Sequence, residues 1–237
     1  MTPDALPLAS PQETLGGIVA ARPRAAALFE DLGLDYCCGG GKTLQDACRE
    51  HDLEPAAITA ELEWLDAEAD DGQEHDVGGL TVAELSEHIV DSHHEPARAQ
   101  MDRIAELLAK VVRAHGEHDP STHALQQHFA ALQAELDQHM RAEEKELFPA
   151  CRTLEDGGPR PSDELLEHLQ DTHSATGTAL AELRELGNGY DPASAHCATH
   201  RVLLSELTAF ELELHRHIHE ENNILFREVR RLLAERR

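Results

Sequence analysis

Two segments of this sequence match each other closely: His139-Met-Arg-Ala-Glu143-Glu-Lys-Glu-Leu147-Phe148 and His217-Ile-His-Glu-Glu221-Asn-Asn-Ile-Leu225-Phe226. Each segment places a histidine four residues before a glutamate and nine residues before a phenylalanine. On an α-helix, residues i and i+4 lie on the same face, so each segment presents an imidazole beside a carboxylate. Each pair can therefore bind one edge of a metal ion.

A histidine also precedes each segment at a matching distance. A lone His-x-x-x-Glu pair is most often a solvated pair on a helix surface, but two copies with matching neighbours favour metal ligands. Imidazole and carboxylate ligands without thiolate suit iron or manganese and, less well, zinc. The upstream residues are His94, 45 residues before His139, and His173, 44 residues before His217.

His93 and His219 are the nearest alternatives to the chosen histidines. Helical geometry turns His93 by about 100° from His94, and His219 by about 200° from His217, away from the same inner line. The other histidines are expected at the surface or behind the ligands.

From Thr81 onward the sequence predicts long helices, with apolar residues at helical spacing and glycine or proline at each border. Four helices with short connections are typical of an antiparallel bundle, and inward-facing glutamates and histidines in such bundles build di-iron or di-manganese sites. Pro96 should kink the first helix, so His94→Ala is expected to cost less metal affinity than His139→Ala. The predicted helices span residues 82–113, 122–153, 163–186 and 192–233.

Shorter helices are predicted before Thr81. Helix starts are expected at Ser10-Pro11, after Pro23, at Thr43 and at Pro55, with Gly33 ending the second helix. Residues 67–80 are polar, acidic and glycine-containing, which is typical of a linker. The sequence therefore predicts an all-α protein with a small helical cysteine-containing domain (1–66), a linker (67–80) and an antiparallel four-helix bundle (81–237).

Composition excludes several classes of function. The chain has 237 residues, a formal charge of −26 and 17 histidines, and so strong a negative charge argues against nucleic acid or an anionic membrane as a partner. Its 5 cysteines are an odd number, which does not fit the disulfide framework of a secreted domain. Because a signal peptide and a long apolar run are also lacking in the sequence, the expected location is the cytoplasm.

Several motifs carry a resemblance to a known family. The segment Asp35-Tyr-Cys-Cys-Gly-Gly-Gly-Lys-Thr-Leu-Gln-Asp-Ala-Cys48 resembles the cysteine motif in the N-terminal domain of the Repair of Iron Centres family. The two His-x-x-x-Glu segments resemble the hemerythrin-like domain of that family, as do His93-His94, Asp171-Thr-His173 and Ala195-His-Cys197-Ala-Thr199.

The resemblance implies a di-iron protein that repairs iron-sulfur clusters damaged by nitrosative or oxidative stress, by binding or reducing nitric oxide, by donating iron, or both. It implies two non-haem irons joined by an oxo or hydroxo bridge, nitric oxide or dioxygen as small ligands, and damaged iron-sulfur proteins as partners. Nitric oxide reductase activity and a homodimer stay open. The implied ligands are His94, His139, Glu143, His173, His217 and Glu221, with both glutamates bridging the irons.

Cys37 and Cys38 are the candidate catalytic residues of the N-terminal domain. Lys42 and the helix start at Thr43 are close in sequence, and positive charge and helix amides lower the pKa of a thiol. Adjacent cysteines pair with each other only under strain, so reaction with iron, nitric oxide or a partner's thiol is expected. The alternative is a buried structural pair of thiols.

Two other functions compete with cluster repair. One is a hemerythrin-type sensor of dioxygen or nitric oxide, although the sequence shows no output domain and no basic DNA-binding patch. The other is an iron or zinc buffer that uses the histidine-rich acidic surface. Ligand type alone does not separate iron from zinc.

Overall fold

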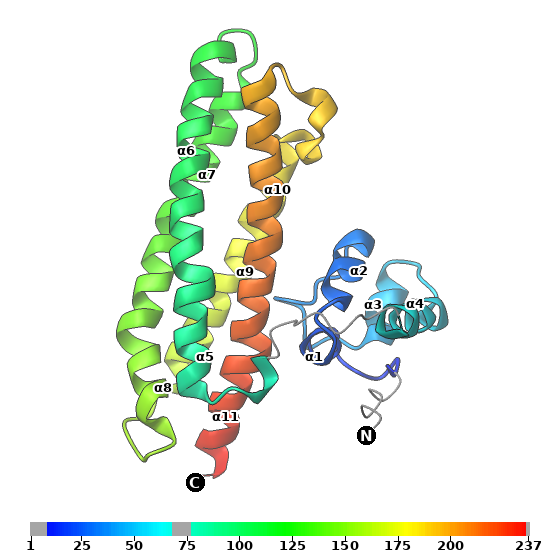
Figure 1. Ribbon diagram of the computed structural model, residues 1–237, viewed down its shortest axis with the longest axis vertical. Coiled ribbons are helices and arrows are strands. Elements are labelled where there is room, and N and C mark those ends of the chain that lie inside the picture. Colours follow the sequence, from blue (N-terminus) through cyan, green and yellow to red (C-terminus); the bar gives the residue numbers. More distant parts are fainter. Residues whose placement is uncertain (1–8, 68–76, 236–237) are drawn as a thin grey trace. The chain divides into compact units, whose positions relative to one another are not determined.

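A computed structural model describes residues 9–67 and 77–235 (Figure 1). Within these residues all regular structure is helical, apart from one isolated antiparallel bridge between Thr14 and Thr43. The all-α prediction is confirmed. Most of the predicted linker, residues 68–76, lies outside the described residues. No helix in the described part of the chain combines the length and the apolar character needed to cross a membrane.

The chain divides into two compact units. The first unit contains the described residues up to Leu80 together with Ile218–Glu228, and the second contains Thr81–His217 and the described residues from Val229 onward. The segment Ile218–Glu228 therefore groups with the first unit by its contacts, although it continues the last long helix of the second.

Four short helices form the N-terminal part of the first unit. Thr14 and Thr43 cap α1 and α3, because the side chain of each accepts a hydrogen bond from the backbone N–H three residues later. Gly33 ends α2 with a left-handed conformation, as predicted. The helices are α1 (Leu15–Ala21), α2 (Ala25–Leu32), α3 (Leu44–Glu50) and α4 (Pro55–Ala67).

The predicted helix start at Ser10 is wrong. Ser10 and Glu13 do exchange hydrogen bonds, but these close a turn and the helix begins only after Thr14. The cause is a long-range pairing: the Leu15 N–H donates to the carbonyl of Lys42, and the Leu44 N–H donates to the carbonyl of Glu13. These bonds hold the chain extended at the point where a helix from Ser10 would have continued.

The second unit is built on long helices that run side by side in alternating directions, as α6, α7, α9 and α10 do in Figure 1. Thr81 and Glu84 form the predicted capping box at the start of α5. From Thr81 onward the segments are α5 (Val82–Ile89), η2 (Val90–His94), α6 (Glu95–His115), α7 (Ser121–Ala142), η3 (Glu143–Leu147), α8 (Phe148–Leu154), α9 (Asp163–Leu186), α10 (Ala198–His219), η6 (Glu220–Leu225) and α11 (Phe226–Glu235). Of these, η6 and the adjoining ends of α10 and α11 lie in Ile218–Glu228, which belongs to the first unit.

The predicted start of the fourth long helix at residue 192 is also wrong. Asp191 caps only a short 3-10 turn, η5 (Pro192–Ser194), by accepting a hydrogen bond from the Ala193 N–H. The chain is extended again at Ala195, and α10 begins at Ala198. A good capping residue followed by proline therefore starts one turn here, not the helix.

In the described part of the chain, three π-helical turns interrupt the long helices. Each turn contains a residue of the two sequence segments or one of their upstream histidines. η2 ends at His94, η3 begins at Glu143, and Glu221 lies in η6. Such wide turns are rare in proteins, and those that occur are often found at functional sites. Pro96 lies two residues after the end of η2, and the backbone at Glu95 keeps helical angles of φ −65° and ψ −47°. The chain therefore accommodates the proline by widening one turn, and the backbone around His94 stays helical.

The core of the bundle unit depends on large apolar side chains from facing helices. The rings of Phe129 and Phe210 meet edge to face with centroids 5.9 Å apart, and both side chains are buried. Val202 lies on the same helix as Phe210 but is 42% exposed. Phe210 and Val202 both lie in α10, so a comparison of the two positions isolates the effect of burial.

We expect Phe210→Ala to lower the free energy of unfolding by about 3–5 kcal/mol, because it removes buried contacts and leaves a cavity. Val202→Ala on the same helix should change it by less than about 0.5 kcal/mol. Urea unfolding followed by circular dichroism measures both values. Equal losses in the two variants would contradict the packing described here.

Candidate metal centre

The structure brings all six predicted ligands together in the interior. They form two groups, and within each group one potential ligand atom from every residue lies within 4.8 Å of the others. All six side chains are buried. Glu143 and Glu221 belong to both groups, so the arrangement offers two adjacent cation positions that share two carboxylates. The groups are His94, Glu143, His217 and Glu221, and His139, Glu143, His173 and Glu221.

Glu143 lies between two sets of imidazoles. Its Oε2 atom is 3.4 Å from Nε2 of His94, and its Oε1 atom is 3.3 Å from Nε2 of His139 and 3.9 Å from Nε2 of His173. The side chain has no exposed surface, and neither oxygen accepts a hydrogen bond from the described residues. A buried carboxylate without donors is costly unless a cation or proton compensates it. The residues present therefore fit a cation at each oxygen.

The histidine pairs have the spacing of ligands that share an ion. Nε2 of His139 and Nε2 of His173 are 2.8 Å apart. Two nitrogens bound to one ion at about 2.1 Å, with an angle of about 90°, lie about 3 Å apart. The rings of His94 and His217 have centroids 4.9 Å apart, close to the 4.6 Å between His139 and His173.

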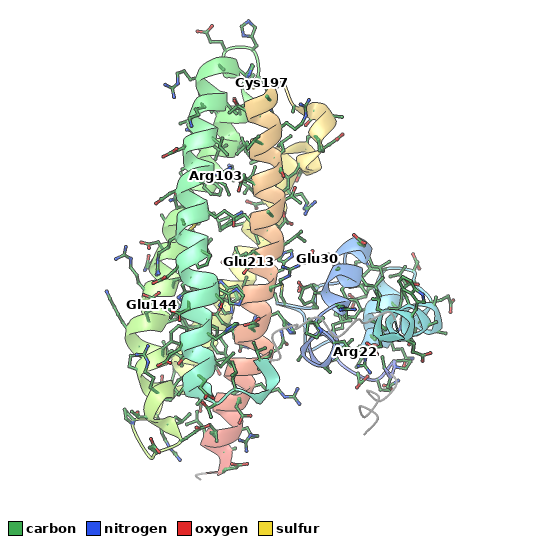
Figure 2. All side chains as sticks on the ribbon, viewed as in Figure 1. Arg22, Glu30, Arg103, Glu144, Cys197 and Glu213 are labelled. Atoms are coloured by element: carbon green, nitrogen blue, oxygen red, sulfur yellow. The ribbon has the colours of Figure 1, made fainter. Side chains whose placement is uncertain are left out.

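Glu144 supports His94 from behind. Its Oε1 atom is 2.9 Å from Nδ1 of His94 and accepts a hydrogen bond from Arg98 at 2.8 Å. Glu144 is labelled in Figure 2. Burial raises the pKa of Glu144, but hydrogen bonds from His94 and Arg98 outweigh burial, so the pKa is lowered overall. An ionised Glu144 holds the proton of His94 on Nδ1 and leaves Nε2 directed at Glu143. The sequence analysis missed Glu144, although it directly follows a predicted ligand.

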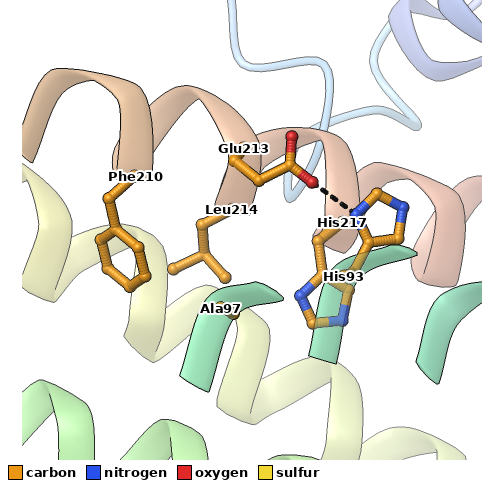
Figure 3. A pocket seen from close by; sticks show the side chains of 6 residues that line it. All are labelled: His93, Ala97, Phe210, Glu213, Leu214 and His217. Carbon is orange, nitrogen blue, oxygen red and sulfur yellow. Dashed lines mark hydrogen bonds and ion pairs between the residues drawn. The ribbon is translucent and has the colours of Figure 1, made fainter. Parts of the chain in front are cut away.

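His93 lies outside both groups, as helical geometry predicted. Its ring stacks parallel to that of His217 with centroids 5.2 Å apart, and its Nδ1 atom is 2.7 Å from Oε1 of Glu213. These residues line a small pocket with three apolar neighbours (Figure 3), so His93 covers one face of a candidate ligand. The neighbours are Ala97, Phe210 and Leu214.

Cys151 is a second residue that the sequence analysis missed near this centre. It is buried on α8, and burial together with the charge of Glu143 raises the pKa of its thiol to about 12. The thiol is therefore neutral at physiological pH. No signal in the sequence identified Cys151 as a neighbour of Glu143.

In the first unit, the candidate cysteines differ in exposure. Cys37 is buried and Cys38 is half-buried. The hydrogen bond with Cys38, burial, and the nearby charge of Asp35 raise the pKa of Cys37 well above its usual range. Lys42 forms an ion pair with Glu50. The prediction that Lys42 lowers the pKa of the pair is therefore wrong for Cys37.

Family comparisons agree with the centre described above. Residues 85–229 match the family described as the hemerythrin HHE cation binding domain, and residues 11–66 match a domain of unknown function, DUF542. By its fold and its histidine and glutamate cluster, this is a helical-bundle protein with a cation-binding domain of the hemerythrin type.

Curated relatives extend the match to nearly the whole chain. It is 34% identical over 214 residues to the iron-sulfur cluster repair protein YtfE of Pectobacterium atrosepticum, covering 90% of this chain and 95% of the relative. It is 30% identical over 215 residues to the iron-sulfur cluster repair protein ScdA of Staphylococcus haemolyticus, covering 88% and 94%. The chain belongs to this family of iron-sulfur cluster repair proteins, the Repair of Iron Centres family.

We expect Glu143→Gln to reduce the bound metal strongly, because an amide cannot neutralise two cations. Glu146→Gln, an exposed position of the same turn, should keep the metal. Metal analysis by mass spectrometry of both purified variants measures this. Stability should respond differently. In metal-free protein, the free energy of unfolding of Glu143→Gln should be at least as high as that of the unsubstituted chain, because the substitution removes an uncompensated buried charge. Full metal content in Glu143→Gln would show that the carboxylate is not a ligand.

His94→Ala should reduce metal content as much as His139→Ala does. This replaces the sequence-based expectation of a smaller effect, because η2 keeps the backbone helical before Pro96 and the His94 side chain is fully buried. His93→Ala is the matched neighbour and should keep both ions. Metal analysis of the three variants decides the matter, and equal losses in His93→Ala and His94→Ala would contradict this ligand assignment.

Proposed function

We propose that this protein is a di-iron protein that repairs iron-sulfur clusters damaged by nitrosative or oxidative stress. The observation that carries the proposal is the pair of histidine groups sharing Glu143 and Glu221. Its relatives are named iron-sulfur cluster repair proteins, which supports the same assignment. We further propose the division into a cysteine domain (1–66), a linker (67–80) and a hemerythrin-like domain (81–237).

The donor set favours iron in this centre. Each cation position has two imidazoles and two shared carboxylates, which suits a first-row transition metal, and no thiolate belongs to either group. With one further bridging oxygen, each iron would have about one of six positions open for nitric oxide or dioxygen. Bound iron would supply redox chemistry to such small ligands, or would itself be the ion that is donated.

Around the centre, this chain's own residues keep the ligands oriented and exclude water. Glu144 and Arg98 hold the proton of His94 at Nδ1. The ring of Phe148 stacks on His94 with centroids 5.5 Å apart, and Leu147 beside it is fully buried. Apolar cover of this kind preserves the strength of charge interactions inside the site.

We propose that Cys37 and Cys38 serve the repair reaction from the first unit and that the protein acts in the cytoplasm. No disulfide joins any of the five cysteines, all of which lie in the described residues. Reduced thiols of this number fit a reducing compartment.

Metal content and repair activity test this function together. Protein purified without added metal should contain two irons per chain and absorb visible light, and it should restore activity to an iron-sulfur enzyme inactivated by nitric oxide. Glu143→Gln should lose both the iron and the repair, whereas Glu146→Gln should keep both. A colourless protein holding zinc, or many loosely bound ions per chain, would contradict a di-iron repair centre and support buffering.

The cysteine pair requires a separate test. A Cys37→Ser, Cys38→Ser double variant should keep its two irons and its helical content yet lose repair of the damaged cluster. Cys197→Ser, a half-buried cysteine of the bundle unit, is the matched control and should keep full repair. Full repair by the double variant would leave the pair with a packing role only.

A further inference from the structure

A second cluster of metal-ligating atoms lies in the first unit, formed by Asp35, Cys37 and Cys38. One potential ligand atom from each residue lies within 4.8 Å of the others. The two Sγ atoms are 3.8 Å apart, and Sγ of Cys37 is 3.4 Å from Oδ1 of Asp35. None of these residues belongs to the histidine and glutamate groups of the metal centre.

These separations match the edges of a tetrahedral metal site. Two sulfurs bound at about 2.3 Å to one tetrahedral ion lie about 3.8 Å apart, and a sulfur and an oxygen of such an ion lie about 3.5 Å apart. Both distances in the cluster agree with these values to within about 0.1 Å. An ion could therefore enter with little rearrangement of the side chains.

The backbone that carries the cluster is held from two sides. The Asp35 carboxylate accepts hydrogen bonds from the N–H groups of Cys37, at 3.2 Å, and Cys38, at 2.9 Å. Within the same unit, Nδ2 of Asn223 donates to the carbonyl oxygens of Tyr36, at 3.2 Å, and Cys37, at 3.1 Å. Side chains on a backbone supported in this way lose less freedom when they bind an ion.

The cluster is open on one side. Cys37 is only 6% exposed, but Cys38 is half-buried and Asp35 is exposed. A cation can therefore reach the three ligands from solvent, and a fourth position stays available to water or to a ligand from another molecule. Three protein ligands with an open fourth position are typical of reactive metal sites, whereas structural sites are closed by four.

We propose that Asp35, Cys37 and Cys38 bind one thiophilic divalent cation, ferrous iron or zinc, at a site separate from the histidine and glutamate centre. Two thiolates and a carboxylate suit both ions, and a bound cation displaces the protons of its thiol ligands. If the proposed repair function holds, this would be a place where a single ferrous ion is held with one open position. The binding site itself does not depend on that function.

Cobalt(II) is the probe for this site, since thiolate ligands give cobalt a near-ultraviolet charge-transfer band that histidine and glutamate ligands do not. We expect iron-loaded full-length protein to bind one equivalent of cobalt with this band, read as a difference spectrum. Cys38→Ser should abolish the band, and Cys197→Ser should leave it unchanged. Iron content and circular dichroism establish that each variant is folded and loaded.

Asp35→Asn separates the charge of Asp35 from its hydrogen bonds. The amide keeps an oxygen that can accept from the Cys37 and Cys38 N–H groups, so the loop should stay in place while cobalt affinity falls roughly tenfold or more. Absence of the band in the unsubstituted protein, or its survival in Cys38→Ser, would overturn the proposal. A band without repair activity would contradict the proposed function alone, and repair without a band would contradict this site alone.

Discussion

The candidate metal centre depends on one buried carboxylate. Glu143 has no exposed surface, accepts no hydrogen bond from the described residues, and has one oxygen near His94 and the other near His139. Such a group is tolerated only where cations or protons compensate its charge. The helices that pack at Glu143 therefore form a candidate cation-binding centre. The buried histidines and Glu221 supply its other candidate ligands.

The π-helical turns explain how regular helices supply this centre. A wide turn changes which side chains face inward, and each of the three turns contains a candidate ligand. Pro96 and Pro149 follow two of the turns closely. Since proline donates no backbone hydrogen bond, its position after a wide turn costs less than its position in an ordinary helix. Pro96 and Pro149 therefore lie in the first turns of α6 and α8, where proline is tolerated, and do not break the long helices.

Two residues of the segment Ile218–Glu228 have different candidate roles. Ile218–Glu228 continues the last long helix, and its contacts group it with the N-terminal residues. Glu221 is a candidate ligand in this segment, and Asn223, two residues later, binds the carbonyl oxygens of Tyr36 and Cys37. A short stretch of helix therefore carries both a ligand and the support of the cysteine loop, which gives the Asn-Asn pair after Glu221 a structural reason.

The sequence by itself predicted the all-α class, the helical bundle and the six candidate ligands that the structure brings together. Repetition at helical spacing was sufficient for this, because the i and i+4 positions of a helix share a face whatever surrounds them. The helix starts predicted at Ser10 and at residue 192 were wrong because they depend on contacts beyond local spacing. The Leu15 N–H pairs with the carbonyl of Lys42, so no helix continues from Ser10. Asp191 caps only one short turn, so no long helix begins at residue 192.

Only the tertiary structure decided which groups act together. It assigned His94 with His217 and His139 with His173, placed Glu144 behind His94, and raised the pKa of Cys37 where nearby Lys42 had predicted the reverse. Distances between side chains on different helices, and the burial that governs their charge, depend on packing over the whole chain. Local spacing carries no information about either quantity.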